Sequence, residues 1–511
     1  MDGKHIGSLK LISEHPYIVS GLLCISVWLL TGGSTSVTGI NSKTMMVIYI
    51  TLMALLFIFM AVLAIIKKLD IKAAAIMCAA GGFLARTWYV IYAKTSDIYQ
   101  HDVGTFDFDM NKAVHDNYIL YLLNNHHLPD FDFRGTGQFY HPPLHHAISA
   151  AAIKVNSLIF PGRAGDYGFL QCISLFYSLV TLILIYKILK AFGFEKTALI
   201  CSFALACFYP YLIVSAGHIN NDPLANMLVI AAFYNAIKWY REHSFGRIII
   251  TAICIGLGMM TKISAGLIAF PVGFIFLAAL IKARFRDKKM WLMFLTFAAV
   301  VFPLGLWFPV RNYIRWGIPP TYVFDLGIVP NQDLSGYSVA DRLFGISPVT
   351  SSIPFVVFDI NNKDYNIFMT LFKSSLFDEF DHHNSELFVL LAILLTIVAL
   401  IVMVMIIAGA VKAFIKAVKE KNIELFAVFI LMFTELTSCI LFAFKYPLIC
   451  SVNFRYVLPL IICSAVFTAT CFDFKSRNEY LSLLTKFMTG AICLFCMASA
   501  AFYSCEFLAF M

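Results

Sequence analysis

Hydrophobic and polar positions alternate along this chain in long blocks. Apolar runs of about 20 residues, the length that crosses a bilayer as a helix, recur throughout the chain. The pattern predicts an all-α membrane protein with about thirteen spanning helices. They are expected near residues 16–33, 44–66, 73–94, 166–190, 196–215, 222–240, 247–262, 264–282, 290–310, 386–410, 423–443, 454–472 and 482–505.

Composition agrees with a lipid environment. Hydrophobic residues make up 60% of the 511 positions and charged residues 13%, whereas a soluble domain is roughly half apolar and a quarter charged. The mean hydropathy is +0.80. A net charge of +8 would suit nucleic acid, but lysine and arginine gather in short segments between apolar runs, as in cytoplasmic loops. We therefore expect the bilayer, and no nucleic acid, as a partner.

The basic segments predict how the chain crosses the membrane. When the runs are threaded alternately, the clusters at 67–72, 187–196, 238–247, 282–289 and 412–421 all fall on one side. Basic loops are retained in the cytoplasm. The N-terminus is therefore expected inside the plasma membrane and the C-terminus outside. Chemistry is expected on the outer face, where the long polar segments and most of the histidines fall.

The same threading divides the chain into four parts. Residues 1–70 hold two additional N-terminal helices, and 71–310 form a membrane module that includes a large outer loop, 95–165. Residues 311–385 form a second outer loop or cap, and 386–511 the C-terminal helices. Two helices of the first outer loop, near 110–124 and after Pro142-Pro143, are expected along the membrane surface.

His101-Asp102 directly follows the third expected helix, which puts a carboxylate at the bilayer rim, where a lipid-linked substrate presents its head group. A sugar carried on phosphate already has a leaving group. Transfer then needs one base for the acceptor hydroxyl and cations for the departing phosphate. Direct attack would invert the anomeric centre. We predict Asp102 as the base; the alternative is that Asp102 caps a turn.

Further candidates lie in the same outer loop and at an outer turn. Tyr140, His141, His145 and His146 stand together, and on one helix His141 and His145 would share a face. This pair, with Asp102 or Asp116 nearby, leaves a zinc site open as an alternative, although no cofactor is otherwise indicated. Asp116 and Asp222 are further candidate acids, with helix capping as the alternative.

Three cations are expected at the outer membrane boundary: Lys262, Arg311 and Arg455. A charge there is costly unless it is paired or reaches the surface, so a lipid phosphate is a natural partner and snorkelling the alternative. The acidic and histidine-rich string 377–383 could contact an acceptor or a metal. A solvated loop is the favoured interpretation of that string.

Several short motifs, taken in order, resemble one family. They are Asp102 after an outgoing helix, Q-F-Y-H-P-P-L-H-H at 138–146, N-N-D-P-L at 220–224, T-K-I-S-A-G at 261–266, V-R-N-Y at 310–313 and F-R-Y-V-L-P at 454–459. The set resembles the C-type glycosyltransferases. It is most similar to bacterial members related to protein O-mannosyltransferases and the lipid A aminoarabinose transferase.

The resemblance implies a C-type glycosyltransferase bundle, a polyprenyl-phosphate-linked sugar donor and an early-loop carboxylate, Asp102, as base. It also implies that Arg311 and Arg455 contact the carrier phosphate. One departure is that His141 stands where the aminoarabinose transferases have a lysine. A histidine donates to phosphate more strongly when protonated, so its contribution would depend on pH.

Two other functions stay open. A transporter also has many helices with charges, but it predicts ionisable residues at the bilayer midplane. A lipid-linked glycan polymerase or ligase would use a similar donor and is expected to carry its main loop late in the chain. The acceptor is left open among glycans, glycolipids and proteins.

Overall fold

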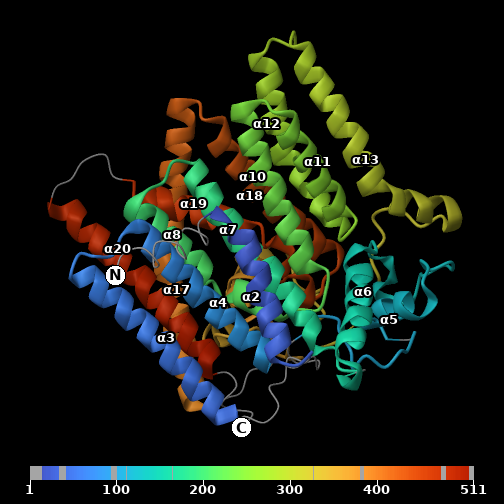
Figure 1. Cartoon of the computed structure of the whole chain (residues 1–511), viewed down its shortest axis with the longest axis horizontal. Coiled ribbons are helices and arrows are strands. Elements are labelled where there is room, and N and C mark those ends of the chain that lie inside the picture. Colours follow the sequence, from blue (N-terminus) through green and yellow to red (C-terminus); the bar gives the residue numbers. More distant parts are fainter. Residues whose placement is uncertain are drawn as a thin grey trace.

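The computed structural model describes residues 14–33, 42–93, 100–110, 112–163, 165–325, 327, 329–379, 385–473 and 479–505. Within these ranges the chain is helical, and strand pairing is confined to one isolated bridge between Asp333 and Leu448. The helices of the bundle are α2 (Pro16–Leu30), α3 (Ser42–Ile65), α4 (Ile71–Tyr92), α7 (Gln171–Ala191), α8 (Lys196–Cys207), α9 (Pro210–Val214), α10 (Asp222–Glu242), α11 (Phe245–Met259), α12 (Ala269–Lys282), α13 (Lys288–Trp316), α17 (Glu386–Glu420), α18 (Ile423–Lys445), α19 (Leu460–Cys471) and α20 (Glu479–Cys505). Their arrangement is shown in Figure 1.

Each of the thirteen expected segments contains helix, but not every helix meets the requirements of a span. Within the described ranges, eight helices are long and apolar enough to cross a membrane, or up to ten if each of two bent pairs is one span. Helices α2 and α11 are apolar but shorter. The chain is therefore a multi-pass membrane protein, while thirteen crossings and their direction stay predictions.

The segment expected as one helix at 196–215 is broken. Its two parts, 196–207 and 210–217, meet at 55°. Pro210 begins the second part, and because proline lacks an N–H it cannot continue the ladder of α8. The guanidinium of Arg86 lies in the break, where Nη1 donates to the Cys207 carbonyl at 2.6 Å and Nε to Ser178 Oγ at 2.8 Å. The break directs residues 218–222 toward the site described below.

The expected segment 454–472 is likewise bent. Residues 449–457 and 460–471 meet at 59°, with Pro459 between them. The first part contains the short 3-10 helices η7 (Ile449–Ser451) and η8 (Phe454–Val457). This bend places Arg455 on a loop-like turn instead of a straight helix.

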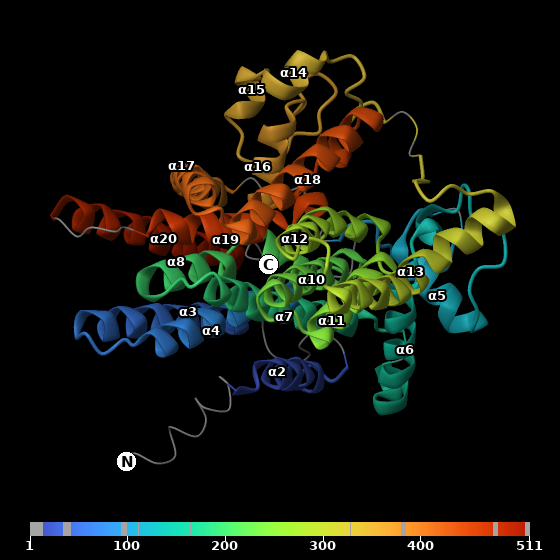
Figure 2. The ribbon, with the colours of Figure 1, turned by 90° about the horizontal axis from the view of Figure 1, so that it is seen from above.

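The two segments expected on the outer face, 95–165 and 311–385, both contain helices and are called the first and second outer segments below. The first holds α5 (His115–Asn125), η2 (Gly137–Tyr140) and α6 (Leu144–Ile159), and the second holds α14 (Val339–Phe344), α15 (Pro348–Ser351) and α16 (Ile367–Phe377). Figure 2 shows α14, α15 and α16 grouped on one side of the bundle, and α5 beside the end of α13. Lys373 and Asp364 form a buried ion pair at 2.9 Å inside the second segment. The second segment is therefore folded, and it is called the cap below.

Candidate functional site

One cavity of about 1320 Å³ lies between the first outer segment, the cap and the ends of several bundle helices. Seven of the residues singled out from the sequence line it: His101, Asp102, Tyr140, His141, Asp222, Lys262 and Arg455. They come from segments far apart in the chain. The cavity is therefore the candidate active site.

Asp102 lies on a tight turn that opens its side chain to this cavity. Its φ of 56° is in the left-handed region, which aspartate tolerates better than most residues. Its carbonyl accepts a hydrogen bond from the backbone N–H of His115 at 2.6 Å, which fixes the turn against the start of α5. The side chain remains 42% exposed. The carboxylate is therefore held in place and open to a substrate.

Arg455 provides the cation that faces Asp102. Its Nη1 lies 3.2 Å from Asp102 Oδ2 and its Nη2 donates to Tyr456 Oη at 2.8 Å. The backbone N–H of Arg455 donates to Asn453 Oδ1 at 2.8 Å, which caps the 3-10 turn that carries it. Arg455 is buried and lines the cavity.

A second ion pair, between Lys262 and Asp222, lies in the same wall. Asp222 is the first residue of α10, and its N–H donates to Asn220 Oδ1 at 3.0 Å. The ammonium of Lys262 also lies 4.9 Å from the centre of the Tyr456 ring. Because Arg455 stacks on that ring at 4.8 Å as well, one tyrosine organises both cations.

His141 lines the cavity in front of a buried group of histidines. Its ring stacks on His115 with centroids 5.3 Å apart, and His115 Nδ1 lies 2.9 Å from His146 Nε2. Burial and the nearby Lys262 hold the pKa of His141 well below its usual range. His141 is therefore a neutral hydrogen-bonding group at neutral pH, which corrects the expectation that its charge would vary there.

The expected helical pair of His141 and His145 is wrong. His141 ends the η2 turn and α6 begins only at Leu144, after the two prolines, so the two histidines share no helical face. In the described part of the chain they belong to no group of three potential ligands close enough to hold a metal ion. His145 and His146 lie behind the cavity wall and do not line it.

Asp116 and Arg311 also lie outside the cavity lining. Asp116 is buried and accepts backbone N–H groups from Gly104 at 2.9 Å and Phe106 at 2.8 Å. Burial raises its pKa, although these two donors oppose the change. The contacts favour the capping interpretation, because both oxygens hold the loop that follows Asp102.

Arg311 is directed toward the first outer segment. Its guanidinium donates to the Pro129 carbonyl at 2.6 Å and to Asn312 Oδ1 at 3.0 Å, and it stacks on Trp316 at 4.9 Å. The neighbouring Asn312 lines the cavity instead. Arg311 therefore does not line the cavity that Arg455 lines, and its implied contact with a carrier phosphate finds no support in this arrangement.

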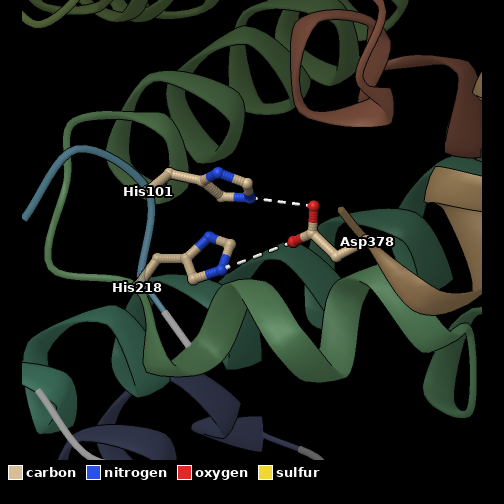
Figure 3. A group of neighbouring side chains, drawn as sticks. All are labelled: His101, His218 and Asp378. Atoms are coloured by element: carbon tan, nitrogen blue, oxygen red, sulfur yellow. Dashed lines mark hydrogen bonds and ion pairs between the residues drawn. The ribbon is translucent and has the colours of Figure 1, made fainter. Parts of the chain in front are cut away.

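Figure 3 shows a buried cluster of His101, His218 and Asp378, which includes the residue that precedes Asp102 in the chain. His101 Nε2 lies 2.8 Å from Asp378 Oδ1, and His218 Nε2 lies 3.7 Å from Asp378 Oδ2. The other ring nitrogen of His101 is 3.0 Å from Glu379 Oε1. The potential ligand atoms of the three residues lie within 4.8 Å of one another, and two imidazoles with a carboxylate match a zinc ligand set.

The charges of this cluster follow from its contacts. Burial disfavours a charged His101, but the Asp378 carboxylate, with hydrogen bonds to Asp378 and Glu379, raises its pKa to about 9. The same contact with His101 overcomes burial and lowers the pKa of Asp378 to about 2. Burial, with His101 close by, lowers the pKa of His218 to about 3, so this ring is neutral.

Sequence reasoning undervalued this cluster. The string that contains Asp378 and Glu379 was interpreted as a solvated loop, yet Asp378 is only 1% exposed. Asp381, His382 and His383 of that string lie outside the described residues. His218 has no predicted role of its own beyond the general expectation that most histidines fall on the outer face. The available signal was the crowding of carboxylates and histidines next to polar turns on one predicted face.

Part of this site lies in a segment of the chain that matches a known protein family. Residues 141–307 match the model of a family described as dolichyl-phosphate-mannose-protein mannosyltransferase. No curated protein sequence matches the chain significantly.

Among solved structures, the chain is similar to the apo form of the oligosaccharyltransferase of Archaeoglobus fulgidus, with a TM-score of 0.50 and 13% identity. The match covers 84% of this chain and 56% of the archaeal protein, so the chain spans little more than half of that protein's length. The same protein in complex with Zn and sulfate gives a TM-score of 0.49 at 15% identity, with 84% and 53% coverage.

Proposed function

We propose that the chain transfers a monosaccharide from a polyprenyl-phosphate carrier to an acceptor hydroxyl, with inversion, at the outer face of the membrane. The match of residues 141–307 to the model of the dolichyl-phosphate-mannose-protein mannosyltransferase family supports this proposal. The observation that carries this proposal is the wall of the cavity. An open carboxylate, Asp102, lies beside two cations, Arg455 and Lys262, in a space large enough for a sugar phosphate.

Asp102 is the proposed general base. In the reaction the acceptor oxygen attacks the anomeric carbon, its proton passes to a carboxylate oxygen of Asp102, and the bond from that carbon to the phosphate oxygen breaks. The electron pair leaves with the phosphate, which gives a glycoside of inverted configuration and free polyprenyl phosphate. Since one carboxylate suffices, no covalent sugar intermediate is needed.

In the proposed reaction Arg455 has two roles: it pairs with Asp102 before the donor binds, and it binds the carrier phosphate afterwards. In the absence of substrate, Arg455 Nη1 lies 3.2 Å from Asp102 Oδ2, so the guanidinium forms an ion pair with the carboxylate. A carrier phosphate in the cavity would attract the same guanidinium, because a planar fork meets two phosphate oxygens well. Asp102 would then be released to accept a proton, so donor binding would activate the base.

Lys262 and the neutral groups at the other side of the cavity complete the proposed donor site. The Lys262 ammonium, held by Asp222 and the Tyr456 ring, would meet the growing negative charge on the leaving phosphate. Tyr140 and neutral His141 would contribute hydrogen bonds to sugar or phosphate. Apolar side chains such as Leu267, Phe308 and Phe442 line the cavity too and would contact the first prenyl units.

The decisive experiment offers the purified chain, in lipid nanodiscs, a panel of undecaprenyl-phosphate-linked hexoses and pentoses with a cell-envelope extract as acceptor. One donor should be consumed, free undecaprenyl phosphate should appear by mass spectrometry, and the product anomer should be inverted by NMR. Mass spectrometry of envelope glycans and glycoproteins from cells with and without the chain would then identify the acceptor.

Two outcomes would reject the proposal. Retained anomeric configuration would contradict a single displacement with one base. Movement of intact donor across the bilayer of sealed vesicles, with no cleavage, would identify a transporter instead.

A further inference from the structure

The cluster of His101, His218 and Asp378 has one feature that hydrogen bonding within the protein leaves unexplained. Asp378 Oδ1 receives His101 Nε2 at 2.8 Å, Asn453 Nδ2 at 2.7 Å and the Glu379 backbone N–H at 2.9 Å. Asp378 Oδ2 is buried and has no hydrogen-bond donor among the described residues. A buried carboxylate oxygen without a donor is costly, because it loses its hydration and gains nothing in return.

The unpaired oxygen faces an imidazole at a distance too long for a hydrogen bond. His218 Nε2 lies 3.7 Å from Asp378 Oδ2, and the His218 ring is buried with a pKa well below neutrality. Two ligand atoms of a tetrahedral zinc ion, each about 2.0–2.2 Å from the metal, lie roughly 3.4 Å apart. The separation therefore suits a shared cation better than a shared proton.

The surroundings of His101 also suit a metal ligand. Its Nδ1 is 3.0 Å from Glu379 Oε1, which leaves Nε2 directed into the cluster. Metal-binding histidines usually donate their second N–H to a carboxylate, which fixes the tautomer and the ring orientation. Asn453 gives the equivalent support to Asp378 through the oxygen that does not face His218.

From these contacts we infer that His101 Nε2, His218 Nε2 and Asp378 Oδ2 bind a divalent cation of the zinc type. Binding would displace the proton that His101 shares with Asp378 Oδ1, and a water molecule would complete four ligands. His218 and Asp378 do not line the cavity, so the ion would lie behind the wall and would not contact the donor.

The three ligands come from three separate parts of the fold. His101 belongs to the first outer segment, His218 follows the broken helix pair, and Asp378 ends α16 of the cap with a φ of 59°. An ion bound to all three would fasten the cap to the turn that carries Asp102. Its role would be to hold the cavity wall in place.

The test measures metal content, without any assay of transfer. The chain is purified without a histidine tag, exchanged into metal-free buffer and analysed by inductively coupled plasma mass spectrometry. About one zinc per chain is expected in the wild type, and less than about a tenth of that in His218→Ala and Asp378→Asn, which each lack one of three ligands. His127→Ala, at an exposed histidine of the first outer segment, should keep the full content.

A second measurement keeps the inference testable if those variants fold poorly. Wild-type protein should lose thermal stability with a strong chelator and recover it with zinc, and cobalt should give the visible absorption of a four-coordinate site. Folded wild type that binds neither ion, and whose melting temperature ignores chelator and zinc, would overturn the inference. Asp102→Asn should keep its metal, so this result and the test of sugar transfer can fail independently.

Discussion

Two neighbouring residues, His101 and Asp102, belong to regions of opposite character. Asp102 is 42% exposed and lies in the cavity wall with Arg455 and Lys262. His101 also contributes to the cavity lining, but it is only 5% exposed, and its two ring nitrogens contact Asp378 and Glu379 in the buried cluster.

The difference separates groups that can change partners from groups that cannot. In the wall, the ion pair of Arg455 and Asp102 lies beside the cavity. A phosphate bound there can therefore replace Asp102 as the partner of Arg455. Behind the wall, removing either partner of a buried pair leaves an uncompensated charge, which is strongly destabilising. Wall residues should therefore govern turnover, and buried residues should govern stability.

The largest effect is expected from Asp102→Asn. The amide keeps the shape of the side chain but cannot take a proton, so turnover should fall by about 10² to 10⁴-fold, while folding and donor binding stay nearly unchanged. Single-turnover kinetics with saturating donor measures this loss directly. Asp107→Asn, an exposed aspartate of the same loop that pairs with Lys112, serves as control and should keep wild-type turnover. Near-normal turnover of Asp102→Asn would remove Asp102 as the base.

Acid should destabilise the fold through its buried histidines. Burial lowers the pKa of His145 to about 4, and it holds those of His115, His141 and His146 well below the usual value. The unfolded chain protonates histidine below a pH of about 6.5. It then binds more protons than the folded protein, so stability falls as the pH drops from 6.5 toward 4.

His145 alone should contribute on the order of 3 kcal/mol of this loss at the acid end. Melting temperatures measured across this pH range should therefore decline, and His145→Gln should decline less steeply. The exposed His127→Gln should follow the wild type. Identical slopes for all three proteins would contradict a neutral, buried His145.

The residues of the cavity wall could be predicted from the sequence, whereas the buried cluster behind the wall could not. Asp102, His141, Asp222, Lys262 and Arg455 were all singled out, and all line one cavity. Polar residues at the ends of apolar runs are visible in the sequence, and their placement on one predicted face is enough to suggest that they meet.

The buried layer could not be recognised in this way. His101 and Asp378 are 277 positions apart, and nothing in the composition of either segment shows that the other will cover it. Arg311 illustrates the opposite error, because an arginine beside an apolar run satisfies the same pattern whether it faces a cavity or a backbone carbonyl such as that of Pro129. The break after Cys207 had a signal in Pro210, but the sequence gives no sign that Arg86 from another helix donates to the Cys207 carbonyl there.

Arg455, which lines the cavity, and Arg311, which does not, therefore offer a sharper comparison. Arg455→Lys should lower kcat/KM for the donor about tenfold, because an ammonium cannot hold two phosphate oxygens in a planar fork. Arg311→Lys should change kcat/KM little, since Arg311 contacts Pro129 and Trp316 and not the cavity. Initial rates at several donor concentrations test both variants. Equal losses would mean that both arginines meet the phosphate.

The smallest effect on turnover is expected from Asp116→Asn. Each carboxylate oxygen of Asp116 accepts one backbone N–H, from Gly104 and from Phe106. The amide can accept only one of them, so the free energy of unfolding should fall by about 1 kcal/mol. Turnover should change far less than the roughly hundredfold that loss of a general base costs, because Asp116 does not reach the cavity. Denaturation in detergent and donor consumption, measured on the same preparation, separate the two effects. A large loss of turnover at unchanged stability would show that Asp116 acts in the chemistry, and the division between wall and buried layer would then fail at this residue.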